Sequence, residues 1–190
     1  MLELLKNSKG KVLNLFFKNV DRKYYLSEIA KILGKEPGYY QRIVNDFVEE
    51  GILTDERKGN LRFFRLNKNY PLYEEIKKIV SKTVGVEGSL KELVSKLQNI
   101  EYSFIFGSMA RDKQIAGSDI DLMLIGEVDQ DILIKKIGKL ELELSREINY
   151  QIYSKQEVIN KLNEKNDYFV NIFSKPIILL KGNIYDFKKF

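Results

Sequence analysis

At 190 residues the chain has room for one domain or two small ones, and its composition (44% hydrophobic, 31% charged) is that of a globular rather than a membrane protein. It contains no cysteine and no histidine, which excludes disulfides, thiolate or imidazole metal sites, and Ser-His-Asp or Cys-His catalysis. Carboxylates are therefore the only strong metal ligands left. No apolar run is long enough to span a bilayer and the N-terminus lacks a signal-peptide pattern, so we expect a cytoplasmic protein without a membrane partner.

The charge is distributed unevenly along the chain. Residues 1–83 contain 17 Lys and Arg against 11 Asp and Glu, a net charge of +6, whereas residues 84–190 contain 15 against 16, a net charge of −1. A positive surplus in one segment is typical of a surface that binds nucleic acid. We therefore expect a nucleic-acid partner to bind the first segment.

Hydrophobic periodicity in the first segment predicts three helices followed by a β-hairpin. The helices are expected at 2–16, 26–33 and 37–50, with Gly34 ending the second and Pro37 beginning the third. A short strand at 52–53, a polar turn over 54–60 and a second strand at 61–66 predict the hairpin.

This order of elements resembles a winged helix-turn-helix domain, and the stretches LSEIAKILG and YYQRIVNDFVEEGIL resemble the second and third helices of many bacterial and archaeal regulators. In that family the third helix enters the major groove of DNA and the wing touches the phosphate backbone. The resemblance implies a reading surface made of Gly38, Tyr39, Gln41, Arg42 and Asn45. It implies wing contacts from Arg57, Lys58 and Arg62. The alternative is a winged helix that binds another protein or presents a substrate.

A linker is predicted after the hairpin. Tyr70-Pro71 interrupts the pattern, 72–83 predicts a helix, and Gly85 and Gly88 follow it. We therefore expect a first domain over 1–69, a linker helix within 70–86 and a second domain over 87–190. The linker helix could dock the two domains or pair with a second copy, so a homodimer is an open prediction.

In the second domain, strands alternate with helices. Strands are predicted at 102–106, 119–125, 147–153 and 176–180, and helices at 89–97, 108–113, 129–144 and 155–163. The alternation predicts a mixed sheet with helices mainly on one face. With the first segment, the fold class is an α+β protein of two domains.

Two short motifs in the second domain contain side chains that could bind a phosphate and a metal ion. Gly107-Ser108 follows a strand and offers backbone N–H groups and a hydroxyl to a phosphate, to which Arg111 adds a guanidinium. Asp119 and Asp121 lie two residues apart, so a strand would place both carboxylates on one face. A hard cation such as Mg²⁺ would neutralise them, and it commonly takes one or two carboxylates together with substrate phosphates.

The pattern Gly107-Ser108, Ala110-Arg111, Ser118-Asp119-Ile120-Asp121-Leu122 resembles the signature of polymerase beta-like nucleotidyltransferases, above all the small minimal ones. The resemblance covers about half of the chain. It implies that Asp119 and Asp121 bind Mg²⁺ (or Mn²⁺) and that a nucleoside triphosphate, with ATP as the expected one, lies on Gly107, Ser108, Arg111 and Ser118. An acceptor would then attack the α-phosphorus and pyrophosphate would leave.

Two positions depart from the family pattern. The family's third catalytic carboxylate corresponds to Asn149, which follows Arg146-Glu147-Ile148, and Asp112 stands where a glycine is usual. An amide ligates a metal weakly and cannot take a proton. Three functions therefore stay open: nucleotidyl transfer to an acceptor, which in minimal nucleotidyltransferases is often a protein such as a HEPN-type partner; a transcriptional regulator whose catalytically degenerate domain senses nucleotide or dimerises; and a transferase that acts on RNA or tRNA.

Overall fold

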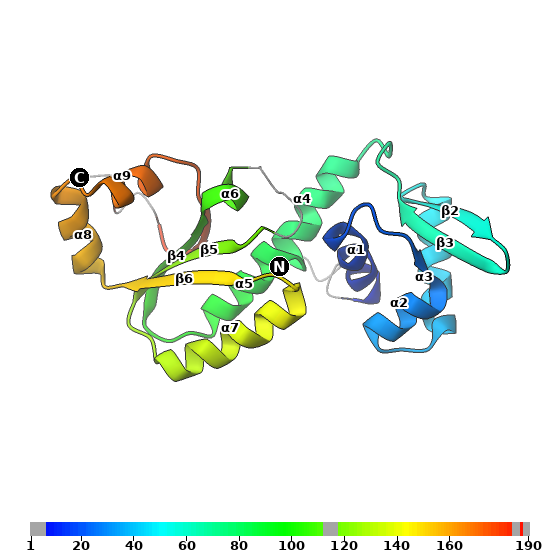
Figure 1. Cartoon of the computed structure of the whole chain (residues 1–190), viewed down its shortest axis with the longest axis horizontal. Helices are drawn as coiled ribbons and strands as arrows, with labels where there is room; N and C mark the ends of the chain where they lie inside the picture. Colours follow the sequence, from blue (N-terminus) through cyan, green and yellow to red (C-terminus); the bar gives the residue numbers. More distant parts are fainter. Residues whose placement is uncertain (1–6, 112–117, 184–186, 188–190) are drawn as a thin grey trace. The chain divides into compact units, whose positions relative to one another are not determined.

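The computed structural model describes residues 7–111, 118–183 and 187. The chain divides into two compact units, Met1–Gly88 and Ser89–Phe190, and the division falls within one helix, α5 (Val86–Ser95) (Figure 1). The predicted start of the first helix, the predicted helix residues 112 and 113, and Asp112 itself lie outside the described residues.

The first unit contains the predicted helices and hairpin in the predicted order. Its elements are α1 (Ser8–Lys18), β1 (Tyr24–Tyr25), α2 (Leu26–Leu33), α3 (Pro37–Glu49), β2 (Leu53–Lys58), β3 (Leu61–Leu66) and α4 (Tyr73–Thr83). The strands form an antiparallel sheet in the order β1-β3-β2. The strand β2 is longer than predicted, so only Gly59 and Asn60 remain as the turn, and β1 was not predicted.

The core of the first unit follows from helical spacing. Tyr40, Val44 and Phe47 lie on one face of α3 and are buried, as predicted. Phe16 of α1 meets Tyr24 edge to face, with ring centroids 5.2 Å apart. The helix α4 belongs to the same core, because its Val80 is buried in this cluster. One continuous cluster therefore holds the three predicted helices, the sheet and α4 together.

The second unit is built on a four-stranded mixed sheet. Besides α5 it contains β4 (Ile100–Phe106), α6 (Gly107–Ala110), β5 (Ile120–Gly126), α7 (Gln130–Leu144), β6 (Ile148–Tyr153), α8 (Lys155–Asn163), α9 (Asp167–Phe173) and β7 (Ile178–Lys181). The strand order is β6-β5-β4-β7. The strand β5 runs parallel to β6, while β4 is antiparallel to both β5 and β7.

The sequence predicted helices mainly on one face of this sheet. In the structure, helices cover both faces. Met123 and Ile125 of β5 are buried in a cluster with Val158 of α8 and Phe169 of α9. Leu122 and Leu124 point to the opposite face, along which α5 and α7 run (Figure 1). The only residue from Ile120 to Ile125 that is not fully buried is Asp121, which lies on the same face as Met123 and Ile125 and marks the part of that face left uncovered by α8 and α9.

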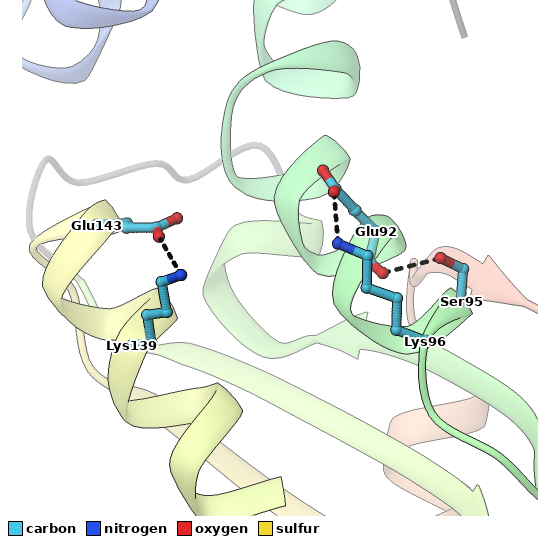
Figure 2. Close-up of polar contacts among 5 residues, drawn as sticks. All are labelled: Glu92, Ser95, Lys96, Lys139 and Glu143. Carbon is cyan, nitrogen blue, oxygen red and sulfur yellow. Dashed lines mark hydrogen bonds and ion pairs between the residues drawn. The ribbon is translucent and has the colours of Figure 1, made fainter. Parts of the chain in front are cut away.

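The exposed sides of α5 and α7 carry charged pairs four residues apart. Figure 2 shows the pair formed by Glu92 of α5 and Lys96, which directly follows this helix, and the pair formed by Lys139 and Glu143 of α7. The charged atoms are 2.7 Å apart in the first pair and 4.0 Å apart in the second. The Ser95 hydroxyl donates to the Glu92 carbonyl at 2.8 Å. Exposed pairs of this kind add little to stability and mark the solvent side of each helix. Among the described residues, no helix combines the length and apolar character that crossing a membrane requires.

Candidate functional site

The turn after β4 brings its backbone against a carboxylate of the next strand. Gly107 has a φ of +74°, in the left-handed region, and a Cβ at this position would overlap Oδ2 of Asp121. Glycine therefore satisfies two requirements here: the backbone angle and the close approach of Asp121. Ser108 lies in α6 directly after this turn, and Arg111 follows α6 and donates from Nε to the Gly107 carbonyl at 3.1 Å. The predicted phosphate-binding residues are thus held beside Asp121.

Asp119 and Asp121 interact electrostatically across the start of β5. Burial is the main cause that raises the pKa of Asp121, the negative charge of Asp119 adds to it, and Arg111 opposes it. Two neighbouring carboxylates form a local negative site that a cation would stabilise. The predicted pair is therefore brought together at the open end of the sheet.

Asn149 lies at the same place, on the neighbouring strand. Its Cα is the register partner of Asp121 in the parallel β5–β6 pair, and its Nδ2 donates to Oδ2 of Asp119 at 3.4 Å. A third carboxylate at this position would add negative charge, whereas the amide instead donates a hydrogen bond. The structure thus places the Asn149 amide beside Asp119.

Arg146 fixes the segment that carries Asp119. Its Nε donates to the Ser118 carbonyl at 2.7 Å, Nη2 donates to the same oxygen, and Nη2 also lies 3.0 Å from the Ser118 hydroxyl. Burial lowers the pKa of Arg146 and the Asp119 charge opposes this shift. The Ser118 hydroxyl, predicted to bind nucleotide, is therefore engaged by Arg146, and this contact holds the start of β5 against the start of β6.

A pocket of about 580 Å³ opens beside Asp121. It is lined by Phe106, Asp121, Ile148, Asn149, Tyr150, Gln151 and Tyr168. The Tyr168 hydroxyl donates to Oε1 of Gln151 at 2.7 Å, which fixes an aromatic ring at the pocket wall. The lining combines polar side chains with aromatic rings, and a few fixed polar groups in a pocket can orient a small molecule.

Sequence reasoning missed five of these lining residues, which are Phe106, Ile148, Tyr150, Gln151 and Tyr168. Gln151 lies two residues after Asn149, so strand alternation could have placed it on the same face. Phe106 directly precedes Gly107 and could have been found from the motif. Tyr168 comes from α9, and no local signal in the sequence brings it to the pocket.

The donor set fits a hard divalent cation that shares its ligands with a substrate. Within residues 7–111, 118–183 and 187 there is no group of three or more His, Cys, Asp or Glu side chains that could hold a metal ion. Asp119 and Asp121 supply two carboxylates, so the remaining oxygen ligands would come from water and phosphates, as is common for Mg²⁺.

In the first unit, the predicted DNA-binding residues divide into two groups. Gln41 and Arg42 are exposed on α3, and Arg57 and Lys58 are exposed at the end of β2. A Cβ on Gly38 would meet nothing within 4 Å, so the start of α3 is open as well. These five residues lie where a partner could reach them.

The other three predicted residues are engaged within the protein. Arg62 donates from Nε to Asp55 at 2.6 Å and from Nη1 to Oδ1 of Asn45 at 2.8 Å, which links β3 to α3. The Tyr39 hydroxyl lies 2.7 Å from the Ser8 hydroxyl, and the ammonium of Lys35 lies 3.9 Å from the Tyr39 ring centroid. Sequence spacing could not predict these contacts, because each joins residues of different elements or of a turn.

Acidic residues near this surface are paired with cations. Lys9 lies 3.1 Å from Asp46, and Lys23 lies 2.6 Å from Glu56. Asp55 is the partner of Arg62, and this hydrogen bond is the main cause that lowers the pKa of Asp55. Each of these three carboxylates is therefore already paired with a cation within the first unit.

The sequence profile of the family described as Polymerase beta, Nucleotidyltransferase matches residues 88–184, just over half of the chain. The chain belongs to this nucleotidyltransferase family. A relative from Methanocaldococcus jannaschii, with the provisional name protein adenylyltransferase MJ0604, is 36% identical over 80 residues, which are 40% of this chain and 79% of the relative.

Solved structures similar to this chain are more distant relatives. One, described as a toxin-antitoxin with AMP-PNP, is 18% identical, covers 53% of this chain and 75% of its own, and has a TM-score of 0.37. A mutant of ZitR of Lactococcus lactis in its apo form is 16% identical over 74% of this chain and 84% of its own, also with a TM-score of 0.37. At these scores neither structure decides the fold of either unit.

Proposed function

We propose that the second unit binds a nucleoside triphosphate together with Mg²⁺ (or Mn²⁺) and transfers its nucleotidyl group to an acceptor. The observation that supports this most is the convergence of Asp119, Asp121 and the Gly107 turn at the mouth of a pocket. Membership of the nucleotidyltransferase family supports the same reaction class.

Each residue at the site has a role in this proposal. Asp119 and Asp121 would hold the metal, and Gly107, Ser108 and Arg111 would hold the phosphates. Bound metal would polarise the α-phosphate and offset the charge of the leaving pyrophosphate. Arg146 acts through Ser118 and orients the segment that carries Asp119. Tyr168 and Gln151 form the pocket wall and orient the ligand.

The transfer forms one bond and breaks one. An acceptor oxygen bonds to the α-phosphorus, the bond from that phosphorus to the oxygen bridging to the β-phosphate breaks, and pyrophosphate leaves with the electron pair. The acceptor proton passes to Asp121 or to water, because the Asn149 amide cannot accept it. We therefore expect slower transfer than with a third carboxylate.

We propose ATP as the nucleotide and a protein as the acceptor. The relative's name, protein adenylyltransferase, supports both choices, and a HEPN-type protein is the partner to test first. Incubation of the protein with Mg²⁺, α-labelled ATP and a cell lysate should label a protein band, and Asp119→Ala should abolish the label. Label found only in RNA would favour the RNA-directed alternative instead.

The Asn149 amide favours a second candidate for the same unit, a catalytically degenerate nucleotide sensor or dimerisation unit within a transcriptional regulator. A comparison of the wild type with Asn149→Asp distinguishes the transferase from the sensor. Binding of ATP and Mg²⁺ without any transfer, together with transfer in Asn149→Asp, would favour the sensor.

For the first unit we propose a winged helix that binds DNA. The exposed Gln41 and Arg42 on α3, the exposed Arg57 and Lys58 on the hairpin, and the pairing of the nearby acids support it. Arg and Gln side chains can read base edges, while Lys and Arg suit phosphates. Equal affinity for the DNA upstream of the gene and for random DNA would contradict a sequence-specific regulator.

A further inference from the structure

Three large apolar residues of α7 are exposed, and two of them, Ile134 and Leu142, lie on one side of the helix, whereas Ile132 lies on another. Ile134 and Leu142 are 55% and 83% exposed, and Leu142 is the most exposed large apolar residue among those described. Single exposed apolar residues are ordinary. These two, however, lie eight residues apart on one side of a helix, with Gly138 midway between them.

Gly138 has no role within the chain that requires glycine. It lies inside the helix with ordinary helical backbone angles, and a Cβ there would meet nothing within 4 Å. Glycine at such a position destabilises a helix by roughly 1 kcal/mol relative to alanine. A reason for it therefore lies outside the chain, and the close approach of another backbone is the one that glycine serves.

The order of residues around Gly138 is self-complementary. If a second α7 crossed the first in antiparallel direction with Gly138 on a two-fold axis, Ile134 would face Leu142 of the partner subunit. Lys135 would face Glu141 of the partner subunit. One oxygen of this carboxylate, Oε1, accepts from the Ile148 N–H of its own chain at 2.8 Å, so the other oxygen would meet Lys135 on each side of the axis. A two-fold interface requires this pattern, because each surface must complement itself.

We propose that a second copy of this chain docks on α7 through the stripe of Ile134, Gly138 and Leu142. The Lys139–Glu143 pair lies beside this stripe on the same helix and forms a charged border to it (Figure 2). One helix of 15 residues offers less than the roughly 800 Å² per partner of a standard interface. The dimer should therefore dissociate on dilution.

The first test uses the absence of cysteine from the chain. Gly138→Cys introduces a single thiol that would meet its own copy on the two-fold axis, within reach of a disulfide. Under mild oxidation this variant should form a covalent dimer at least tenfold faster than Glu143→Cys, a matched α7 variant outside the stripe. Equal rates would overturn the proposal.

The second test measures association without a thiol. In sedimentation velocity over a concentration series, the wild type should shift from monomer to dimer, and Leu142→Lys should stay monomeric with an unchanged melting temperature. Ile132→Lys, which replaces an exposed apolar residue off the stripe, should dimerise like the wild type. A wild type that is monomeric throughout, or a Leu142→Lys variant that still dimerises, would contradict docking through α7.

Discussion

Asp121 makes the stability of the protein depend on pH. Burial, and then the charge of Asp119, raise its pKa, so the folded state holds the proton more tightly than the unfolded chain does. The stabilisation from this shift is full below the ordinary carboxyl pKa and is lost as pH rises through the raised value. We predict that Asp121→Asn raises the melting temperature near neutral pH, and that the gain shrinks as pH falls toward the ordinary carboxyl range.

Thermal denaturation of both proteins across a buffer series measures this effect. Glu127→Gln, which removes an exposed carboxylate after the same strand, serves as the control and should show no comparable gain. A lower melting temperature for Asp121→Asn at neutral pH would mean that the carboxylate is stabilised where it lies.

At Gly107 a single substitution should affect both the backbone conformation and the position of the Asp121 carboxylate. In Gly107→Ala the left-handed backbone costs about 1–2 kcal/mol of unfolding free energy, and the new Cβ must displace the Asp121 carboxylate. We expect loss of stability in urea denaturation and loss of nucleotide binding together. Gly38→Ala is the matched control, because its Cβ has open space within a helix and should leave stability equal or slightly higher.

At the residue scale, the sequence predicted site residues that lie close together along the chain, but not those that come from distant segments. Gly107, Asp119 and Asp121 form a local motif whose geometry follows from a strand, a turn and strand alternation. Tyr168 reaches the pocket from a distant helix, so only the folded sheet reveals it. Arg62 was predicted as a wing contact from its charge alone, and its bonds to Asp55 and Asn45 require the register of the hairpin against α3.

At the element scale, helices were predicted better than short strands. The spacing of Tyr40, Val44 and Phe47 predicted α3. Asp129, where the helix over 129–144 was predicted to begin, caps α7 by accepting from the Ile132 N–H at 3.1 Å. The strand β1 has only two residues, too few to show alternation. Most residues of β2 are polar and exposed, so the sequence predicted a turn there instead of a strand. A hairpin strand can be polar in this way because solvent can cover one face of the hairpin.

The helix α3 and the hairpin should make separable contributions to DNA binding. Arg42→Ala should cost about 1–3 kcal/mol of affinity for a specific site and reduce discrimination between sites. Lys58→Ala should weaken binding to all sequences and reduce the slope of log affinity against log salt by about 0.9. Fluorescence anisotropy across a salt series measures both quantities.

Lys139→Ala, which removes one exposed charge from the second unit, is the control for these variants. It should change neither the affinity nor the slope. If it weakens DNA binding as much as Lys58→Ala does, the interaction is a general charge effect and not a property of α3 and the hairpin.

At the scale of the whole molecule, two compact units imply that unfolding is not a single two-state step. We predict two transitions in calorimetry, of which ATP with Mg²⁺ raises one and DNA raises the other. A ligand at about one hundred times its Kd adds roughly 2.7 kcal/mol to the unit that binds it. A single transition shifted equally by both ligands would instead show that the two units unfold together.

The central claim is that Asp119 and Asp121 form a working metal–nucleotide site despite Asn149. Isothermal calorimetry of ATP with Mg²⁺ tests it most directly, on the wild type, Asp119→Ala and Asn149→Asp. We predict Mg²⁺-dependent binding by the wild type, tighter binding by Asn149→Asp, and none by Asp119→Ala at an unchanged melting temperature. Absence of binding by the wild type, or undiminished binding by Asp119→Ala, would contradict it.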